Sequence, residues 1–420
     1  MSSAPSRPPR LRIVTREIAP IDDPLEYADP ADPLVWTRRS SWLVGVGSAL
    51  TLTASATDAA TLADRWREVA AAAVVDDHVR APGTGLIAFG ALPFDTQSAS
   101  SAVLTVPLLT VGSRDGRTWA SWVLPEEGAP EPDEPRAIGY GPHWSAAVGP
   151  GALTPEGYQD AVRAGLAAIA SGEVSKVVLA RELAGTVPAD ADLRRLVRSL
   201  ASAYPDTWVY AVDGLIGASP ETLVTVSGGQ VTARVLAGTV ARGSGPDADR
   251  EAALRLATSA KDLAEHQYAV RSLVDALTPH TSALAAAEQP FTLALPNVWH
   301  LATDVEATTS PETSALDLLG VLHPTAAVAG TPTAAALAAI RRIEPFDRGR
   351  YAGPVGWVDA HGDGEWAIAL RGAQFDLAAT DAGGIPFRAH AGAGIVAGSD
   401  PEAEMLETRV KFRPIVDALA

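Results

Sequence analysis

The order of strand-like and helical patterns after residue 155 constrains the fold more than any other feature of the sequence. Apolar β-like runs follow one another in groups, and segments with the 3.6-residue period of a helix lie between the groups. A doubly wound nucleotide-binding fold would alternate single strands with single helices, so this order predicts an α+β unit with layered sheets. The predicted helices span 155–169, 191–203, 247–277, 314–322 and 332–343, and the predicted strands span 174–183, 208–212, 222–226, 231–236, 298–305, 353–358, 365–375 and 387–396.

The first 125 residues have weaker patterns, and they contain no catalytic motif that we can identify. They predict strands at 41–46, 86–89 and 102–111 and a helix at 61–75. The Pro/Glu-rich segment 125–135 is too polar for a core element and indicates a linker or a long surface loop. This segment is the best candidate for a boundary between the two parts of the chain, residues 1–150 and 151–420; by the family resemblance described below, the first part would support the same fold and the second would form the catalytic region.

Composition narrows the possible partners. Acidic residues outnumber basic residues by 50 to 33, and the formal net charge of -17 argues against nucleic acid or an anionic membrane as the main partner. The chain has no cysteine, which excludes disulfides, thiolate nucleophiles and cysteine-based zinc sites. It shows neither the apolar core of a secretory signal nor a charge-free stretch long enough to span a membrane. We expect a cytoplasmic protein, in which an anionic substrate would need positive contacts that are few and local.

The predicted last helix carries a group of charged residues on one face. Asp400 is the expected N-cap and Pro401 the first residue of this helix. Glu404, Glu407 and Lys411 follow at relative positions 0, 3 and 7, so their side chains project from the same face. A solvated stripe with a Glu407–Lys411 ion pair is the plainer interpretation. A magnesium site stays open as the alternative, because Mg²⁺ needs only one or two carboxylates besides water and substrate oxygens.

Lys176 begins an otherwise apolar strand. A lysine buried there must lose its charge, find a partner or lie at the exposed end of the strand. A desolvated lysine could act as a general base, whereas a strand-terminal lysine that reaches solvent would have no chemical role. The segment KDLAEH at 261–266 by itself indicates no more than a charged helix surface.

Three further positions could belong to a site, although each also has a structural explanation. Glu221 lies in a turn between two predicted strands, where rigid carboxylates occur both in active sites and in ordinary turns. Arg371 ends the apolar run WAIALR, residues 366–371, within the predicted strand 365–375. Gly392 and Gly394 would let backbone N–H groups approach an oxyanion closely, or they mark strand packing or a bulge.

The joint order of the motifs is more specific than any one of them. The chain contains, in sequence, SKVVLAR, GASPETL, VLAGT, KDLAEH, VWHLAT, LHPTAAVAG, RYAGPVGW, ALRGAQF and AGAGIVAGSDPEAEMLETRVK. Together they resemble the chorismate-utilising enzymes, which include isochorismate synthase, salicylate synthase and the large chains of anthranilate and aminodeoxychorismate synthases. The resemblance is strong from about residue 155 to the C-terminus and fainter at FGALPFD, residues 89–95.

The resemblance implies a fold, a metal and a substrate. The family fold is a single α+β unit in which two similar halves stack their sheets around a buried site. By analogy, Mg²⁺ is held by Glu265 and Glu407, with Glu404 acting directly or through water. The substrate is chorismate, and the residues that match its contacts in the family are Gly238, Thr239, His300, Ala327, Tyr351, Arg371, Gly392, Gly394 and Lys411.

The resemblance also assigns the chemical steps. Lys176 matches the general base that deprotonates a water attacking C2 of chorismate, and Glu221 matches the general acid that protonates the departing C4 hydroxyl. This chemistry needs the pKa of the lysine lowered and the pKa of the glutamate raised, which burial of both groups beside a metal-bound substrate could achieve.

Single positions separate the members of the family. Anthranilate-forming relatives typically carry Gln where this chain has Lys176, and aminodeoxychorismate synthases often carry lysine where it has Ala237. Water is therefore the favoured nucleophile, which predicts isochorismate synthase activity without an obligatory glutaminase subunit. Salicylate synthases keep the same base and acid but tend to have Thr in place of Ala327. Tyr351 and Leu370 slightly favour salicylate synthase, so pyruvate elimination stays an open alternative.

Overall fold

A computed structural model of the chain describes residues 10–124, 135–294, 298–310 and 313–420. Within these ranges, the side chains of Thr239, Ala241, Lys261, Glu265 and Val298 are not described. The predicted linker at 125–135 therefore lies almost wholly outside the described residues. No helix in the described ranges has the length and apolarity needed to cross a membrane.

The described residues form two large sheets. The first has 13 strands, in the order β10 (Ala147–Pro150), β11 (Lys176–Val187), β23 (Ile385–Ile395), β22 (Gly372–Phe375), β13 (Leu215–Ser219), β12 (Trp208–Val212), β2 (Leu34–Arg38), β3 (Ser41–Val46), β8 (Leu109–Arg114), β9 (Arg117–Leu124), β1 (Arg12–Glu17) and β5 (Val74–Asp77), with β19 (Gly330–Thr331) paired to β11. The second has 10 strands, in the order β16 (Thr281–Ala286), β18 (Val298–Thr309), β15 (Gln230–Ala241), β14 (Thr222–Ser227), β21 (Gly364–Ile368), β20 (Pro354–Asp359), β6 (Ile87–Ala91), β7 (Ala102–Val106) and β4 (Leu50–Ala54), with β17 (Phe291–Ala294) paired to β18.

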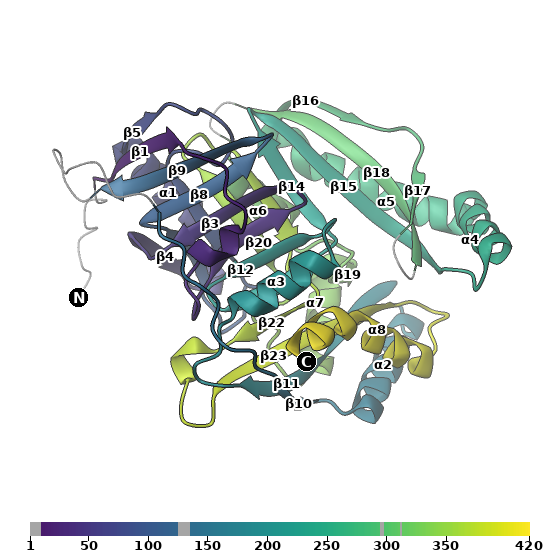
Figure 1. Cartoon of the computed structure of the whole chain (residues 1–420). Helices are drawn as coiled ribbons and strands as arrows, with labels where there is room; N and C mark the ends of the chain where they lie inside the picture. Colours follow the sequence, from purple (N-terminus) through teal and green to yellow (C-terminus); the bar gives the residue numbers. More distant parts are fainter. Residues whose placement is uncertain (1–9, 125–134, 295–297, 311–312) are drawn as a thin grey trace, which may run out of the picture.

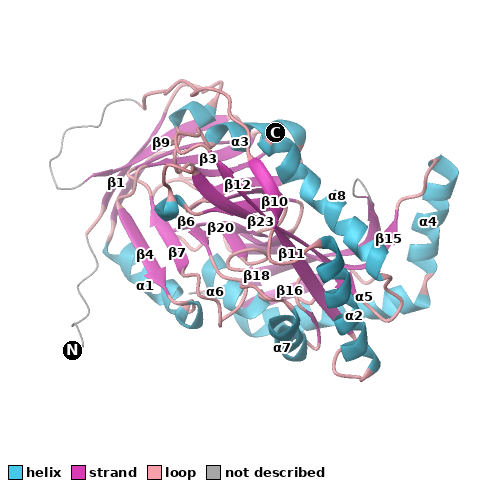
Figure 2. Ribbon diagram, turned by 90° about the horizontal axis from the view of Figure 1, so that it is seen from below, coloured by secondary structure: helices cyan, strands magenta, loops and turns pink. Residues whose placement is uncertain are grey.

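Helices cover the outer faces of the sheets (Figures 1 and 2). The first sheet is covered by α2, α7 and α8 near β11 and β23 and by α3 near β12, while α5, α6 and α1 lie on the second sheet. Their bounds are α1 (Thr61–Ala72), α2 (Pro155–Ala170), α3 (Arg194–Ala203), α4 (Pro246–Thr258), α5 (Ala260–Leu277), α6 (Ala315–Leu322), α7 (Thr333–Ile343) and α8 (Pro401–Leu419). This architecture confirms the predicted α+β class.

Strands from both parts of the chain share each sheet. In the first sheet β12 pairs with β2, and in the second β20 pairs with β6, so residues before 150 supply neighbours for later strands. Trp36 from the first sheet and Trp357 from the second are both buried, and each donates an indole N–H to buried Glu365, at 2.9 and 3.1 Å. The facing sheets thus enclose a core in which the Glu365 carboxylate is paired, as burial requires.

Three predicted elements were too long. The helix predicted at 247–277 is two helices, because Ser259 leaves the helical conformation (φ -71°, ψ 109°) and its side chain caps α5 by accepting from the backbone N–H of Asp262. The strand predicted at 102–111 is β7 and β8, separated at Pro107, which has no N–H to donate. The strand predicted at 365–375 is β21 and β22, separated at Arg371, whose φ of 54° breaks the extended chain.

The predicted start of the last helix is confirmed. The Asp400 side chain accepts hydrogen bonds from the backbone N–H groups of Glu402 and Ala403, and Pro401 is the first residue of α8. The helix predicted at 61–75 ends earlier, at Ala72, and the residues after it form strand β5.

Candidate active site

Lys176 is the first residue of β11 and lies across the neighbouring strand β23. A Cβ atom placed on Gly394 would be 3.0 Å from Lys176 Cε and 3.7 Å from its Nζ. The lysine stem therefore occupies the space that a side chain at position 394 would fill. Lys176 as a whole is half-buried, and the end of its side chain lies over β23.

Glu221 lies in a turn that Ser219 fixes to the second sheet. The Ser219 hydroxyl donates to the carbonyl oxygen of Ile368 at 2.5 Å and accepts from the backbone N–H of Glu221 at 3.2 Å. The backbone N–H of Ile368 in turn donates to the Glu221 carbonyl at 3.0 Å. Sequence reasoning missed Ser219, although a serine two residues before the glutamate is a recognisable turn signal.

Burial raises the pKa of Glu221 above its ordinary value of 4.5. The positive charges of Lys176, Arg371 and Lys411 oppose this rise. The three cations therefore lie within electrostatic range of Glu221, and they come from β11, the segment between β21 and β22, and α8. Glu221 is a carboxyl group suited to hold its proton and donate it.

The charged face of α8 is directed at β23. Lys411 Nζ lies 2.5 Å from Glu407 Oε1 and donates to the carbonyl oxygen of Gly392 at 2.8 Å. Burial lowers the pKa of Lys411, and burial together with the nearby Glu407 raises the pKa of Glu404. The Glu407–Lys411 ion pair of the plainer interpretation is present, but Lys411 also bonds to the adjacent strand, so this face is not simply solvated.

The strand pair β15–β18 brings His300 to the same place. His300 lies opposite Thr239, beside a register shift at Gly238, whose φ of 78° suits glycine. The imidazole hydrogen-bonds with the backbone of Gly238, and burial lowers the pKa of His300 to about 4, so it is neutral near pH 7. The charged groups that act on it are Lys411, Lys176 and Glu407. The Thr239 side chain lies outside the described residues.

Tyr351 and Arg371 both interact electrostatically with Glu221. The Tyr351 ring stacks on His390 with centroids 5.0 Å apart and an angle of 18° between the planes. Burial raises the pKa of Tyr351 to about 12, and the charges of Arg371 and Glu221 act on its hydroxyl. Ala327 lies in the loop before β19. The backbone N–H of Val178 in β11 donates to the Ala329 carbonyl in this loop at 2.9 Å and holds the loop against β11.

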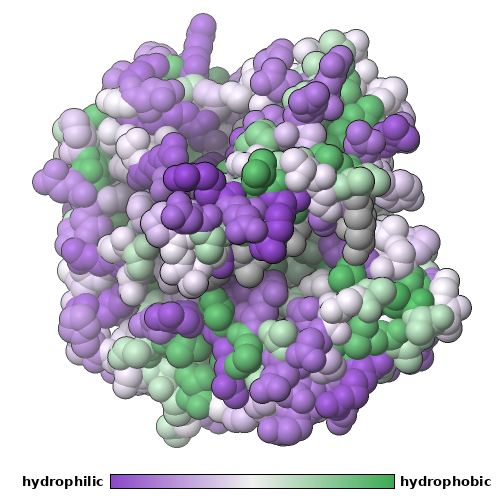
Figure 3. Space-filling view, turned by 90° about the vertical axis from the view of Figure 1, so that its right-hand side faces the viewer, coloured by the Kyte–Doolittle hydropathy of each residue, from purple (hydrophilic) through white to green (hydrophobic). Residues whose placement is uncertain are grey.

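The face of the molecule that carries α4 and α8 is hollowed across its middle (Figure 3).

A sequence model of the family described as chorismate binding enzyme matches residues 143–420. The chain belongs to the chorismate-binding enzyme family. This chorismate-binding enzyme is 41% identical over 277 residues to isochorismate synthase DhbC of Bacillus subtilis, covering 63% of this chain and 68% of the relative. Its fold is similar to that in the crystal structure of DhbC from Bacillus anthracis, with a TM-score of 0.73 and 30% sequence identity. The match covers 94% of this chain and 98% of the DhbC chain. The menaquinone-specific isochorismate synthase MenF of Escherichia coli, at 24% identity, shares the fold with a TM-score of 0.77 over 98% of this chain and 95% of that one.

Two carboxylates of this chorismate-binding enzyme are of the type that Mg²⁺ prefers as ligands. Glu404 and Glu407 are hard oxygen donors one turn apart on α8, and the charge of Glu407 makes ionisation of Glu404 less favourable, a repulsion that a divalent cation would relieve. Glu265 lies in α5, but its side chain is outside the described residues. Among the described side chains, no group of three His, Asp or Glu residues lies close enough to hold a metal. The three-carboxylate set stays a prediction.

The KDLAEH segment contains an anchoring residue that the sequence did not reveal. His266 is only 1% exposed. The prediction that it belongs to a charged helix surface is therefore wrong. Its ring nitrogens contact the Ala237 carbonyl at 3.1 Å and the Thr303 hydroxyl at 2.7 Å, which attaches α5 to β15 and β18 one residue before Gly238. The contacts join elements far apart in the chain, which is why the local pattern did not indicate them.

Proposed function

We propose that this chain is an isochorismate synthase, which converts chorismate to isochorismate. The observation that carries the proposal is the electrostatic interaction of a lysine, Lys176, with a buried glutamate of raised pKa, Glu221, in a protein of the chorismate-binding family. A relative with 41% identity, DhbC of Bacillus subtilis, is named isochorismate synthase and supports the assignment.

The two residues have complementary tasks in the proposed reaction. Lys176 accepts a proton from a water molecule as the water oxygen bonds to C2 of the ring. The ring double bond shifts, the bond between C4 and its oxygen breaks, and Glu221 gives its proton to the departing hydroxyl, which leaves as water. One proton is taken and one is given, so the product is an isomer of the substrate. The same steps in reverse return chorismate, so the reaction approaches a mixture from either side.

The charges around Glu221 fit an anionic substrate. In the free protein, Arg371 and Lys411 lower the pKa of Glu221 and work against its protonation. The carboxylates of chorismate would pair with these cations and weaken their effect on Glu221, while burial continues to raise its pKa. Substrate binding thereby favours the protonated acid that the reaction needs. The net charge of -17 is no obstacle, because the positive contacts are confined to the site.

In this proposal, Glu407 and Glu265 hold Mg²⁺, with Glu404 acting directly or through water. The ion supplies positive charge for the ring carboxylate of the substrate when it is bound. His300, Tyr351 and the backbone around Gly238 orient the ring, and neutral His300 can do so without adding charge.

Product analysis tests the assignment. Purified protein with chorismate and Mg²⁺ should give a mixture of chorismate and isochorismate by chromatography, with the same final ratio from either compound. A coupled lactate dehydrogenase assay should detect little pyruvate, because Ala327 lacks the hydroxyl that could fix the enolpyruvyl group for elimination. Lys176→Ala protein prepared in parallel controls for contaminating enzymes. Stoichiometric pyruvate and salicylate would assign salicylate synthase, and an amine product formed only with glutamine would assign an ammonia-using enzyme.

A further inference from the structure

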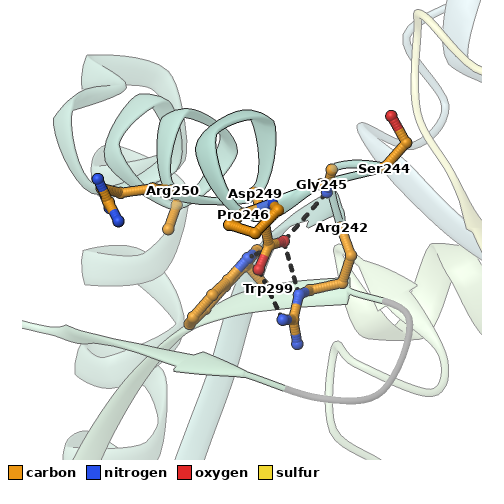
Figure 4. A pocket seen from close by; sticks show the side chains of 9 residues that line it. Arg242, Ser244, Gly245, Pro246, Asp249, Arg250 and Trp299 are labelled. Carbon is orange, nitrogen blue, oxygen red and sulfur yellow. Dashed lines mark hydrogen bonds and ion pairs between the residues drawn. The ribbon is translucent and has the colours of Figure 1, made fainter.

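Asp249, in the first turn of α4, joins the end of β15 to the start of β18 (Figure 4). Its carboxylate accepts from Arg242 through Nε and Nη2, both at 2.6 Å, from the Gly243 backbone N–H at 3.0 Å and from Trp299 Nε1 at 2.9 Å. The Arg242 guanidinium also lies 4.8 Å from the centroid of the Trp299 ring. We call Arg242, Gly243, Asp249 and Trp299 the Asp249 clamp.

The clamp has the features of a specific contact rather than an incidental surface pair. The Arg242–Asp249 bond is bidentate, and the Asp249 side chain is 16% exposed. The hydrogen bond from Arg242 holds the pKa of Asp249 down at about 2, so the carboxylate is charged throughout the physiological range. One acceptor group thus orders three partners, two in the loop that leaves β15 and one on β18.

The clamp and His300 lie on opposite faces of the same strand pair. Trp299 is opposite Val240, and His300 is opposite Thr239 at the next position of β18. Successive residues of a strand point to opposite faces, so Trp299 is directed to α4 and His300 to the charged groups of the candidate active site. The register shift at Gly238 is two residues from Val240. Fixing Trp299 and the residues that follow β15 therefore restrains the backbone next to His300 and the part of β15 that follows Gly238.

We propose that Asp249 is a positioning residue, which holds the ends of β15 and β18 so that His300 and the Gly238 backbone are already in place when chorismate binds. This inference rests on the proposed function and names a residue that serves the same site without touching the substrate. Strand ends fray unless they are fixed, and residues left mobile must be ordered at the moment of binding. His266 independently attaches α5 to the middle of the β15–β18 strand pair. Loss of the clamp therefore loosens the ends of these two strands and leaves the rest of the pair in place.

The chain offers a matched control in Asp304. Arg234 and Asp304 form a second bidentate pair on the same two strands, at 2.5 and 2.9 Å, directly opposite each other. Asp304 is 47% exposed and lies four residues along β18 from His300, which corresponds to about 13 Å. Asp304→Ala removes the same kind of bond from the same strands without disturbing their ends.

The experiment compares Asp249→Ala and Asp304→Ala with the wild type in steady-state kinetics and amide hydrogen exchange. For Asp249→Ala we expect KM for chorismate to rise about tenfold, the effect of having to order one or two residues on binding. The kcat should stay within about threefold, since Lys176 and Glu221 lie on other elements. Exchange should become faster at 240–243 and 299–301, and Asp304→Ala should change neither measurement. Asp249→Asn, which keeps the size of the side chain, should act in the same direction and covers the case in which the alanine variant does not fold.

The outcomes separate this proposal from the proposed function. An unchanged KM in Asp249→Ala, or an equal rise in Asp304→Ala, would overturn the positioning role even in an active isochorismate synthase. If the wild type forms no isochorismate, the proposed function fails, and the clamp is then judged by the dissociation constant for chorismate and by exchange. In that case, weaker chorismate binding and faster exchange in Asp249→Ala, but not in Asp304→Ala, would support the positioning role of Asp249. Unchanged values in Asp249→Ala would refute it.

Discussion

Gly394→Ala tests whether the orientation of Lys176 across β23 matters for turnover. The new Cβ would lie 3.0 Å from Lys176 Cε, whereas carbon atoms in ordinary contact are about 3.5–4.0 Å apart. The lysine stem must therefore move by a few tenths of an ångström, and its ammonium group moves with it. The backbone at 394 is not in the left-handed region, and the neighbour is the flexible end of a side chain, so the strand can accept alanine.

The expected effect is large on catalysis and small on stability. A displacement of about 1 Å in a reacting group can reduce the rate about a hundredfold, so for this smaller shift we expect kcat to fall by roughly tenfold. Rotation of the lysine about its own side-chain bonds costs about 0.5–1.5 kcal/mol, and alanine in a strand recovers about 0.5–1 kcal/mol relative to glycine. The free energy of unfolding should consequently change by less than about 1 kcal/mol.

The assay is isochorismate formation, with unfolding by urea measured on the same preparations. Gly149→Ala is the matched control, because Gly149 lies in β10 of the same sheet and no atom would be within 4 Å of its new Cβ. The decisive comparison adds Gly394→Ala to Lys176→Ala. If Gly394→Ala acts through the lysine, the double variant should be no slower than Lys176→Ala alone. An equal further loss in that background, or a normal rate in the single variant, would refute the reasoning.

Three further predictions concern the acid, the base and the metal. Lys176→Ala should reduce the rate at least about a hundredfold while leaving the circular dichroism spectrum unchanged, and activity within a few-fold of wild type would return the lysine to a packing role. The rate should fall on the alkaline side as pH rises through the raised pKa of Glu221, because the acid must carry its proton; a pH–rate profile that still rises there would contradict this. A chelator should stop turnover, magnesium should restore it, and Glu407→Gln should raise the magnesium concentration required for half activity; full activity in excess chelator would leave α8 without a metal.

Local features of the sequence determined the elements and their class. The cap at Asp400 with Pro401 is set by residues within one turn, and it was predicted correctly. The same local reasoning merged α4 with α5, because the apolar period continues through Ser259 and only the backbone conformation there shows the break. Motif order, which summarises many such local constraints, was enough to place the chain in its family.

The contacts that give the site its chemistry depended on tertiary structure. Lys176 meets Gly394 only because β11 and β23 pair in one register, and a shift by one residue would turn the lysine to the opposite face. Ser219, His266 and Asp249 act through partners distant in the chain, and each has an ordinary local explanation that hides its role. Residue type and periodicity report on neighbours along the chain, whereas burial, pKa and strand-end anchoring depend on which distant segments pack together. The sequence by itself determined which groups this protein possesses, and only the tertiary structure decided which of them meet.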